Sequence, residues 1–550
     1  MTKKSFSWLT KDCRTFLSRG YLKKGQTVEE RVREIADRAE ELVEIEGFSD
    51  KLYDYMSKGW ISLSSPVWSN YGNDKGLPVS CFGSFISDSM ESILLTHAEV
   101  GMLSKFGGGT SGYFGALRPR GSEIKDNGES SGAVHFMELF DKLTDVVSQG
   151  SVRRGYFSAY LDIEHDDFYE FIGVGTEGHP IQNLTTGVCV GDEFMKKVEA
   201  KDKEACKRWA KVIQARSEVG FPYIFWKDTV NRNKPIDFTD LTIYASNMCS
   251  EICLPSSEDD TFVCVLSSLN LLHYDEWKDT DLVETMIIFL DSVCEEFIGK
   301  IIKLFVYKPE AARLLKRALS FAMKYRALGL GVLGFHSYLQ SKMIPFESRE
   351  AARWNLEMMK LICSKAYEAA DNLEEKNNVR NTTLLAIAPT KSSSFILGNV
   401  SQGVEPEFSN FYIKDLAKIK VSQKNKYLEA LLENKGKNTD DVWDSIKKSD
   451  GSVQHLDFLS QEEKDVFKTF IEINPETVID YASVRQPYID QSQSINLMID
   501  PSLPVKDINA LYMRAWKSGM KTLYYQYNLN AAQAMQREKF MKKGCSACEG

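Results

Sequence analysis

The chain has 550 residues, of which 43% are hydrophobic and 26% are charged, and this composition excludes a largely disordered protein. Its length indicates several domains or one large α/β barrel with additions. The net charge of -9 argues against a nucleic-acid-binding surface, because binding to phosphates requires clustered Lys and Arg.

The sequence also lacks the signals of membrane insertion and secretion. It has no apolar run of roughly 18 residues, and its basic N-terminus, MTKKSFSWLTKDCR, is not followed by the apolar core of a signal peptide. The 11 cysteines are scattered and odd in number, which does not resemble a disulfide framework. We therefore expect a cytoplasmic protein without membrane contacts.

Helical and β-like patterns alternate along the chain. Apolar residues recur at helical spacing over 27–46, behind a Thr that can cap the helix N-terminus. Further helices are predicted at 92–106, 282–303 and 351–373, and β-like runs at 185–190, 261–272, 384–387 and 522–527. This order fits strands separated by helices in a mainly parallel sheet or barrel. The predicted domains are an N-terminal helical region (1–60), a barrel (61–535) with a polar helical insertion at about 422–470, and a mobile tail (536–550).

The segment SNMCSEI places an amide, a thiol and a carboxylate at alternate positions, Asn247, Cys249 and Glu251. In an extended chain this period-two spacing points all three side chains to one side. A thiol beside a general base and an orienting amide suits chemistry in which sulfur acts on a substrate while Glu moves a proton. Taken alone, a buried core cysteine in a loop is the commoner explanation.

Four other features have an ordinary structural explanation as well as a chemical one. Cys81 and Cys264 lie in β-like runs, where each is more often a core residue than a redox partner. The tandem Tyr524 and Tyr525 is ordinary in a strand that is buried on both faces. The segment PTKSSS follows an apolar run, so it fits either an anion pocket at a strand-to-helix turn or plain helix capping.

Two familiar types of site are not supported. The run GGGTSG at 107–112 matches GxGxxG, but a helical pattern precedes it and a β-like run follows it, so a dinucleotide fold is rejected, and a P-loop would need a Lys. No HExxH or other metal cluster is found, and Cys545 with Cys548 is only half of a four-cysteine zinc site. We expect no metal or cofactor held by this chain.

Taken together, the motifs resemble the large subunit of class I ribonucleotide reductases, from about residue 21 to the C-terminus. The segments that carry the resemblance occur in the order typical of that family: SSPVWSN, SCFGSF, VSQGSVRRG, NMCSEICLP, VCVLSSLNL, IAPTKSSS, DQSQSIN, KTLYYQYN and CSAC. The resemblance implies a ten-stranded α/β barrel of two five-stranded halves, in which a central finger loop presents Cys249 to the ribose of a ribonucleoside diphosphate.

The resemblance also implies a role for each cysteine. Cys249 would become a thiyl radical and abstract the 3′-hydrogen, Glu251 would deprotonate the 3′-hydroxyl, and Asn247 would hold the substrate. As the 2′-hydroxyl leaves as water, Cys81 and Cys264 would form a disulfide. Cys545 and Cys548 on the tail would then pass reducing equivalents from a thioredoxin- or glutaredoxin-type protein by thiol–disulfide exchange.

By the same resemblance, Tyr524 and Tyr525 are the radical-transfer pair, and a separate metal-containing small subunit supplies the radical. The resemblance further assigns five residues to substrate binding and five to a nucleoside triphosphate effector site at a homodimer interface. The substrate residues are Ser65, Ser80, Thr390, Ser392 and Ser393. The effector residues are Asp88, Ser89, Arg118, Gln149 and Arg153.

Three features depart from the family pattern. Lys391 stands where the family often has an acidic or neutral residue, so phosphate binding or phosphate preference is expected to differ. Arg154 replaces a small residue beside the effector loop, which puts the selectivity rules in doubt. There is no room for an N-terminal ATP-cone, so we expect dATP not to shut the enzyme down through such a domain.

Two alternatives from neighbouring enzyme classes and one non-enzymatic alternative were weighed. A cobalamin-dependent reductase shares the barrel and the cysteine chemistry, but the tandem tyrosines argue against it. A glycyl-radical reductase would need an RVxGY-like site near the C-terminus, which is not found. An inactive nucleotide-binding regulator is disfavoured because all five cysteines of the reductase pattern are present.

Overall fold

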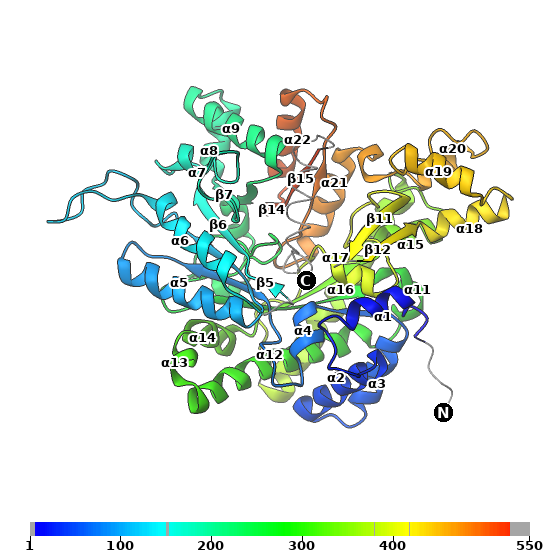
Figure 1. Cartoon of the computed structure of the whole chain (residues 1–550), viewed down its shortest axis with the longest axis horizontal. Helices are drawn as coiled ribbons and strands as arrows, with labels where there is room; N and C mark the ends of the chain where they lie inside the picture. Colours follow the sequence, from blue (N-terminus) through cyan, green and yellow to red (C-terminus); the bar gives the residue numbers. More distant parts are fainter. Residues whose placement is uncertain (1–5, 150–152, 379, 417–418, 529–550) are drawn as a thin grey trace.

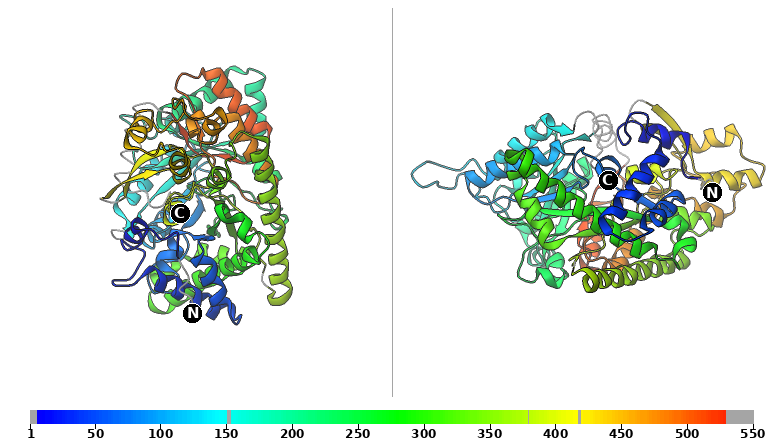
Figure 2. Two further views of the ribbon diagram at one scale, coloured as in Figure 1. Left: turned by 90° about the vertical axis from the view of Figure 1, so that its right-hand side faces the viewer. Right: turned by 90° about the horizontal axis from the view of Figure 1, so that it is seen from below.

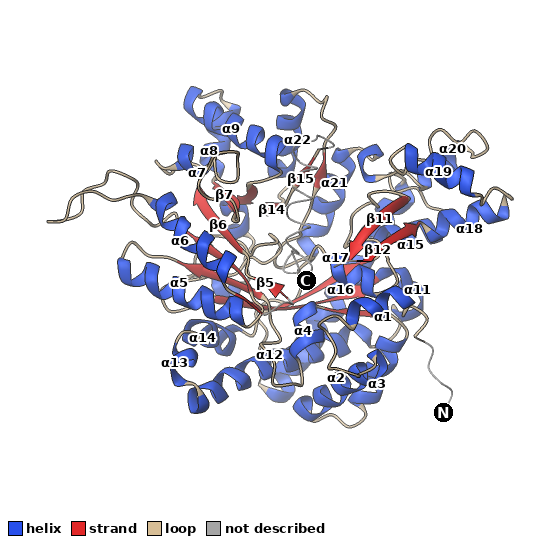
Figure 3. Ribbon diagram, viewed as in Figure 1, coloured by secondary structure: helices blue, strands red, loops and turns tan. Residues whose placement is uncertain are grey.

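The structure is a computed structural model of the whole chain, and it describes residues 6–149, 153–378, 380–416 and 419–528. A central curved sheet is surrounded by helices, as the colouring by secondary structure makes clear (Figure 3). The chain begins with helices on one side of this sheet and returns to the centre with its last described strands (Figure 1).

The first half of the sheet consists of five parallel strands. Each strand pairs in parallel with the next one along the chain, in the order β2-β3-β6-β7-β8. The strands are β2 (Cys81–Phe85), β3 (Gly109–Tyr113), β6 (Phe157–Asp162), β7 (Thr185–Val190) and β8 (Tyr223–Trp226). The run predicted at 185–190 coincides with β7, which is buried along its whole length. Strand β14 (Thr522–Leu523) closes this half antiparallel to β8.

The second half begins at β9 (Phe262–Asn270), which runs antiparallel to β2. Strand β10 (Leu328–Leu333) is parallel to β9, and parallel bridges then join Leu330 to Leu385 and Ile387 to Gln493. The predicted run at 384–387 therefore contributes bridges rather than a regular strand. Strand β1 (Ile61–Leu63) lies antiparallel on the other side of β9, and β13 (Leu497–Met498) pairs with β15 (Gln526–Tyr527).

Long helices cover the sheet close to where the sequence predicts them. Helix α2 (Val28–Val43) begins with a capping box in which the side chains of Thr27 and Glu30 each accept the other residue's backbone N–H. The predicted helices at 92–106, 282–303 and 351–373 are α5 (Met90–Lys105), α12 (Leu282–Tyr307) and α16 (Arg349–Asn377). Helix α16 runs along one side of the molecule (Figure 2).

The remaining helices are short or connect the strands. Those in the first half of the chain are α1 (Lys11–Leu17), α3 (Phe48–Ser57), α4 (Ser65–Asn70), α6 (Ala133–Val146), α7 (Phe168–Phe171), α8 (Asp192–Glu199), α9 (Lys203–Val219) and α10 (Lys227–Arg232). Those in the second half are α11 (Tyr274–Trp277), α13 (Pro309–Arg313), α14 (Lys316–Tyr325), α15 (Phe335–Ser341), α17 (Lys391–Ile396), α21 (Pro475–Arg485) and α22 (Val505–Lys517).

The polar stretch at 422–470 extends from one side of the barrel (Figure 1). A hairpin of β11 (Phe411–Leu416) and β12 (Ile419–Lys424) leads into α18 (Lys426–Asn434), α19 (Asp440–Lys448) and α20 (Gln461–Val466). Apolar side chains of this stretch, including Leu428, Trp443 and Phe467, form a buried cluster separate from the barrel core.

Candidate active site

The loop that carries Asn247, Cys249 and Glu251 is a turn and not the extended segment that period-two spacing predicts. Ser250 adopts a φ of 70°, and its N–H donates to Asn247 O at 3.2 Å. The Asn247 side chain accepts the N–H of Ile252 at 3.1 Å, which closes the turn. The prediction was wrong because an Asn side chain competes with neighbouring backbone for hydrogen bonds and so favours turns over extended chain.

The turn nevertheless brings Asn247 to one of the distant cysteines. Asn247 Nδ2 donates to Cys81 Sγ at 3.6 Å. Cys81 is directly opposite Cys264 in the antiparallel β2–β9 pair. Opposed residues in such a pair have Cα atoms roughly 4.5–5.5 Å apart, which lies within the range that a disulfide spans. The fold therefore places the two cysteines where a disulfide can form.

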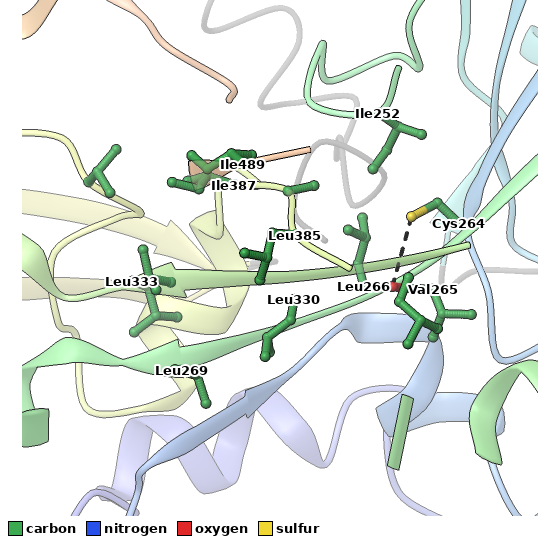
Figure 4. Close-up of a cluster of buried hydrophobic side chains, with 14 of the residues drawn as sticks. Ile252, Cys264, Val265, Leu266, Leu269, Leu330, Leu333, Leu385, Ile387 and Ile489 are labelled. Atoms are coloured by element: carbon green, nitrogen blue, oxygen red, sulfur yellow. Dashed lines mark hydrogen bonds between the residues drawn. The ribbon is translucent and has the colours of Figure 1, made fainter. Parts of the chain in front are cut away.

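Cys264 is 1% exposed and is the more deeply buried of the two thiols. Burial raises the pKa of the Cys264 thiol well above its usual value, against the opposing effect of a hydrogen bond from Gln491 Nε2 at 3.3 Å. Figure 4 shows Cys264 at the edge of an apolar cluster, with Ile252 of the loop nearby. A thiol in this setting stays protonated and can supply a proton together with an electron.

Glu251 is 1% exposed, and its surroundings fix it from two sides. Its backbone O accepts the N–H of Ser492 at 2.8 Å, and its Oε2 accepts from the Ser494 hydroxyl at 3.0 Å. The same hydroxyl is directed at the backbone O of Cys249. The carboxyl group and the radical cysteine proposed by the resemblance are thus held by the segment DQSQSIN.

The tandem tyrosines form a line of rings that leads to Cys249. The Tyr524 hydroxyl donates to Cys249 Sγ at 3.8 Å, and Tyr524 is fully buried. The ring centroids of Tyr524 and Tyr525 are 4.5 Å apart, and those of Tyr525 and Tyr527 are 5.6 Å apart in a stacked geometry. Phenol side chains at these separations can exchange oxidising equivalents with the thiol.

Sequence reasoning did not identify Tyr223 of β8 or Ser494. The Tyr223 ring contacts both radical-transfer candidates, with centroids 4.8 Å from Tyr524 and 5.1 Å from Tyr525. No local pattern marks a single Tyr in a buried strand. Ser494 lies in a segment that carried the family resemblance, and that segment was the available signal.

Most of the predicted substrate residues converge beside β1. Thr390 precedes the six-residue helix α17 with a φ of 52°, and its Oγ1 accepts the N–H of Gly403 at 2.8 Å. Ser393 O accepts from the Ser62 hydroxyl of β1 at 3.3 Å, and Ser65 follows β1 at the start of α4. Ser392 is also buried in α17. Ser80 directly precedes Cys81 of β2, and its O accepts from Gly109 N at 2.6 Å.

The predicted effector residues lie near α5. Arg118 Nε pairs with Asp88 Oδ2 at 2.7 Å, and Ser89 caps the N-terminus of α5. Gln149 and Arg153 are paired across the hairpin of β4 (Ser148–Gln149) and β5 (Arg153–Arg154). Cys545 and Cys548 of the predicted redox tail lie outside the described residues.

The described part of the chain holds neither a metal-binding cluster nor a membrane-spanning helix. Within those residues, no group of three or more His, Cys, Asp or Glu side chains is placed to hold a metal ion. Among the helices that the structure describes, none is long and apolar enough to cross a membrane.

Comparison with known proteins gives a consistent result. The family model for the ribonucleotide reductase barrel domain matches residues 79–206, 202–379 and 370–526. The putative ribonucleoside-diphosphate reductase large subunit of Frog virus 3 is 34% identical over 91% of this chain and 92% of its own length. The corresponding subunit of Invertebrate iridescent virus 3 is also 34% identical, over 87% of this chain and 88% of its own.

Among solved structures, the class Id ribonucleotide reductase alpha subunit of Actinobacillus ureae is 49% identical and superposes with a TM-score of 0.90, covering 97% of this chain and 100% of that one. These matches confirm the predicted α/β barrel and the predicted enzymatic function. The chain belongs to the family of class I ribonucleotide reductase large subunits, the catalytic subunits of these enzymes.

Proposed function

We propose that this chain reduces ribonucleoside diphosphates to deoxyribonucleoside diphosphates through a thiyl radical on Cys249. The observation that carries the proposal is the contact of the Tyr524 hydroxyl with Cys249 Sγ at 3.8 Å, beside a carboxyl group and an opposed pair of cysteines. The diphosphate substrate is inferred from the names of the viral relatives.

The radical reaches Cys249 by hydrogen-atom transfer. The small subunit removes one electron and the phenolic proton from Tyr525, which leaves a phenoxyl radical there. Tyr525 then recovers a hydrogen atom from Tyr524, and Tyr524 takes one from Cys249 Sγ. The contact of the Tyr524 hydroxyl with Cys249 Sγ supports this order, and Tyr223 packs against both tyrosine rings.

Each residue of the turn then has one role in the reduction. The Cys249 thiyl abstracts the 3′-hydrogen of the ribose, Glu251 accepts the proton of the 3′-hydroxyl, and Asn247 donates a hydrogen bond to the substrate. The 2′-hydroxyl leaves as water after taking a proton from the Cys81–Cys264 pair. The pair supplies two electrons and becomes a disulfide, and its second hydrogen goes to C2′. Glu251 returns its proton to the 3′-oxygen, and Cys249 returns the 3′-hydrogen.

Different segments of the chain bind the substrate and deliver the reducing equivalents. Ser65, Ser80, Thr390, Ser392 and Ser393 bind the substrate, the last three at its phosphates. We propose that residues 61–535 form the catalytic barrel, with the helical region 1–60 before it. The tail 536–550 carries Cys545 and Cys548, which exchange electrons with the buried disulfide and then with a thioredoxin- or glutaredoxin-type protein.

A homodimer with an effector site is the second part of the proposal. Helices α5 and α6 expose several large apolar side chains: Met90, Leu94, Leu95, Leu139 and Val146. An exposed apolar patch of this kind is typical of a protein–protein interface. The patch adjoins Asp88, Ser89 and Arg118, so we propose that a second copy covers it and that an effector nucleotide binds there, with Gln149 and Arg153 relaying its identity.

The test is CDP reduction with dithiothreitol and candidate metal-containing small subunits. Cys249→Ser should abolish formation of dCDP. Cys294→Ser is the matched control, because Cys294 is also buried but lies in α12. Full activity in Cys249→Ser would end the proposal. Activity of the wild type that depended on added cobalamin instead of a small subunit would favour the other reductase class.

A further inference from the structure

The side chain of Ser494 lies between the Glu251 carboxyl group and the backbone of Cys249. Its hydroxyl is directed at the backbone O of Cys249 and, at 3.0 Å, at Glu251 Oε2. Ser494 is 3% exposed, and its N–H donates to Ile387 O at 2.9 Å, so it is anchored to the barrel and not to the turn. The mechanism above assigns it no role.

A serine hydroxyl carries one proton and can therefore donate a hydrogen bond to only one neighbour at a time. When Glu251 is ionised, the carboxylate and the Cys249 carbonyl are both acceptors, and Ser494 can donate to only one of them. The carboxylate is preferred, because hydrogen bonds to ionised groups are about twice as strong as neutral ones. When Glu251 is protonated, its own O–H can donate to Ser494 Oγ, and Ser494 then donates to the Cys249 carbonyl.

We propose that Ser494 is a positioning residue that couples the protonation of Glu251 to the turn that holds Cys249. With Glu251 ionised, the hydroxyl orients the carboxylate as the base. Once Glu251 has taken the 3′-hydroxyl proton, the hydroxyl holds the Cys249 carbonyl while Cys249 Sγ carries the 3′-hydrogen. Because it uses Glu251 as the base and Cys249 as the radical residue, this inference rests on the proposed function.

The other titratable groups near Glu251 are two buried thiols and the charged groups that act on those thiols. Cys253 on the same loop and Cys264 on β9 face the carboxyl group. Burial raises the pKa of Cys253 to about 12, and it raises the pKa of Cys264 well above its usual value. Lys521 lowers the pKa of Cys253, and Asp490 raises the pKa of Cys264. Burial raises the pKa of Asp490 itself to about 6, and its titration is common to the wild type and the variants. Both thiols therefore stay neutral near neutral pH.

Thr522 of β14 provides a matched control, because its side chain contacts the same turn. Its Oγ1 donates to Ser250 O at 2.9 Å, one residue from the carbonyl that Ser494 serves. Its other hydroxyl contacts are Ser492 Oγ at 2.8 Å and Gln493 O at 3.3 Å, and neither group titrates. Loss of the Thr522 hydroxyl thus loosens the turn without removing a partner of a carboxyl group.

The experiment measures the pH dependence of dCDP formation by the large subunit with its small subunit, for wild type, Ser494→Ala, Ser494→Thr and Thr522→Val. Removing a donor from an ionised carboxylate raises its pKa. In Ser494→Ala, the acid limb of the pH profile of kcat should therefore shift to higher pH by about one unit. The KM for CDP should stay the same, because Ser494 has no substrate contact in this mechanism. Ser494→Thr and Thr522→Val should keep the wild-type acid limb.

An infrared titration of the large subunit gives a readout without turnover. The protonated Glu251 carboxyl band is isolated by subtracting the spectrum of Glu251→Gln, and it should persist to higher pH in Ser494→Ala. Coincidence of the Ser494→Ala and wild-type profiles in both measurements would overturn the inference. If Glu251→Gln keeps wild-type turnover, the proposed function itself fails; if Glu251→Gln is inactive while Ser494→Ala titrates like wild type, only the role of Ser494 fails.

Discussion

The cysteine pair across β2 and β9 predicts how much product the enzyme makes without added reductant. Each reduction takes two electrons, and the Cys81–Cys264 dithiol holds two, so a variant with Cys545→Ser and Cys548→Ser should form one dCDP per chain and stop. The wild type should form two, because its tail dithiol can reduce the buried disulfide once. Cys264→Ser should form none.

The oxidised chain should also be more stable than the reduced one. A disulfide between these positions closes a loop of roughly 180 residues, which the chain-entropy model converts to at most about 5 kcal/mol. The assay uses pre-reduced large subunit freed of reductant, with the small subunit and CDP, followed by peptide mapping. The cross-linked peptide should contain Cys81 and Cys264 and be lighter by two hydrogens. Product from Cys264→Ser equal to that of the tail variant, or a cross-link through Cys253, would refute this reasoning.

Three further predictions follow from the surroundings of the site. Tyr524→Phe should remove turnover while it costs about 1 kcal/mol of stability, as checked by dCDP formation and thermal unfolding; turnover near the wild-type rate would contradict radical transfer through this hydroxyl. Lys391→Met should raise the KM for CDP several-fold, whereas Lys437→Met, whose lysine lies over Phe458 outside the site, should not; equal KM values in both would exclude a phosphate contact. Burial raises the pKa of Glu405 to about 7, so the folded state binds this proton more tightly than the unfolded state does. Ionisation of Glu405 therefore lowers the free energy of unfolding as the pH rises from about 4.5 to 7. Glu405→Gln should therefore gain stability relative to wild type over that range, by at most about 3 kcal/mol, and a difference in melting temperature that does not grow with pH would disprove the assignment.

Local patterns predicted the regular elements well. The capping box at Thr27, the long apolar helices and the buried strand β7 all follow from spacing and side-chain type within a short window. The pairing of Cys81 with Cys264 could not be derived in that way, because it depends on two strands far apart in the sequence meeting antiparallel. The family resemblance implied this pairing, and the register agrees with it.

For the segment around Cys249, the period-two spacing alone led to a wrong prediction. Alternation of polar residues predicted an extended chain, but the Asn247 side chain and the left-handed backbone of Ser250 form a turn. Residues from other segments contact two of the three side chains: Ser494 contacts Glu251, and Tyr524 contacts Cys249. The contacts that these two residues make with the turn leave no signal in the sequence around Cys249.

The antiparallel junction of β2 and β9 has a mechanical consequence. It is the seam where the two half-sheets join, and the thiols of Cys81 and Cys264, proposed to reduce the substrate, lie on either side of it. In the proposed mechanism, each round of catalysis therefore links the two halves of the barrel covalently, and each exchange with the tail breaks that link. The barrel should therefore alternate between a more rigid oxidised form and a more flexible reduced form during turnover. Amide hydrogen exchange in β2 and β9 should be slower in the oxidised form.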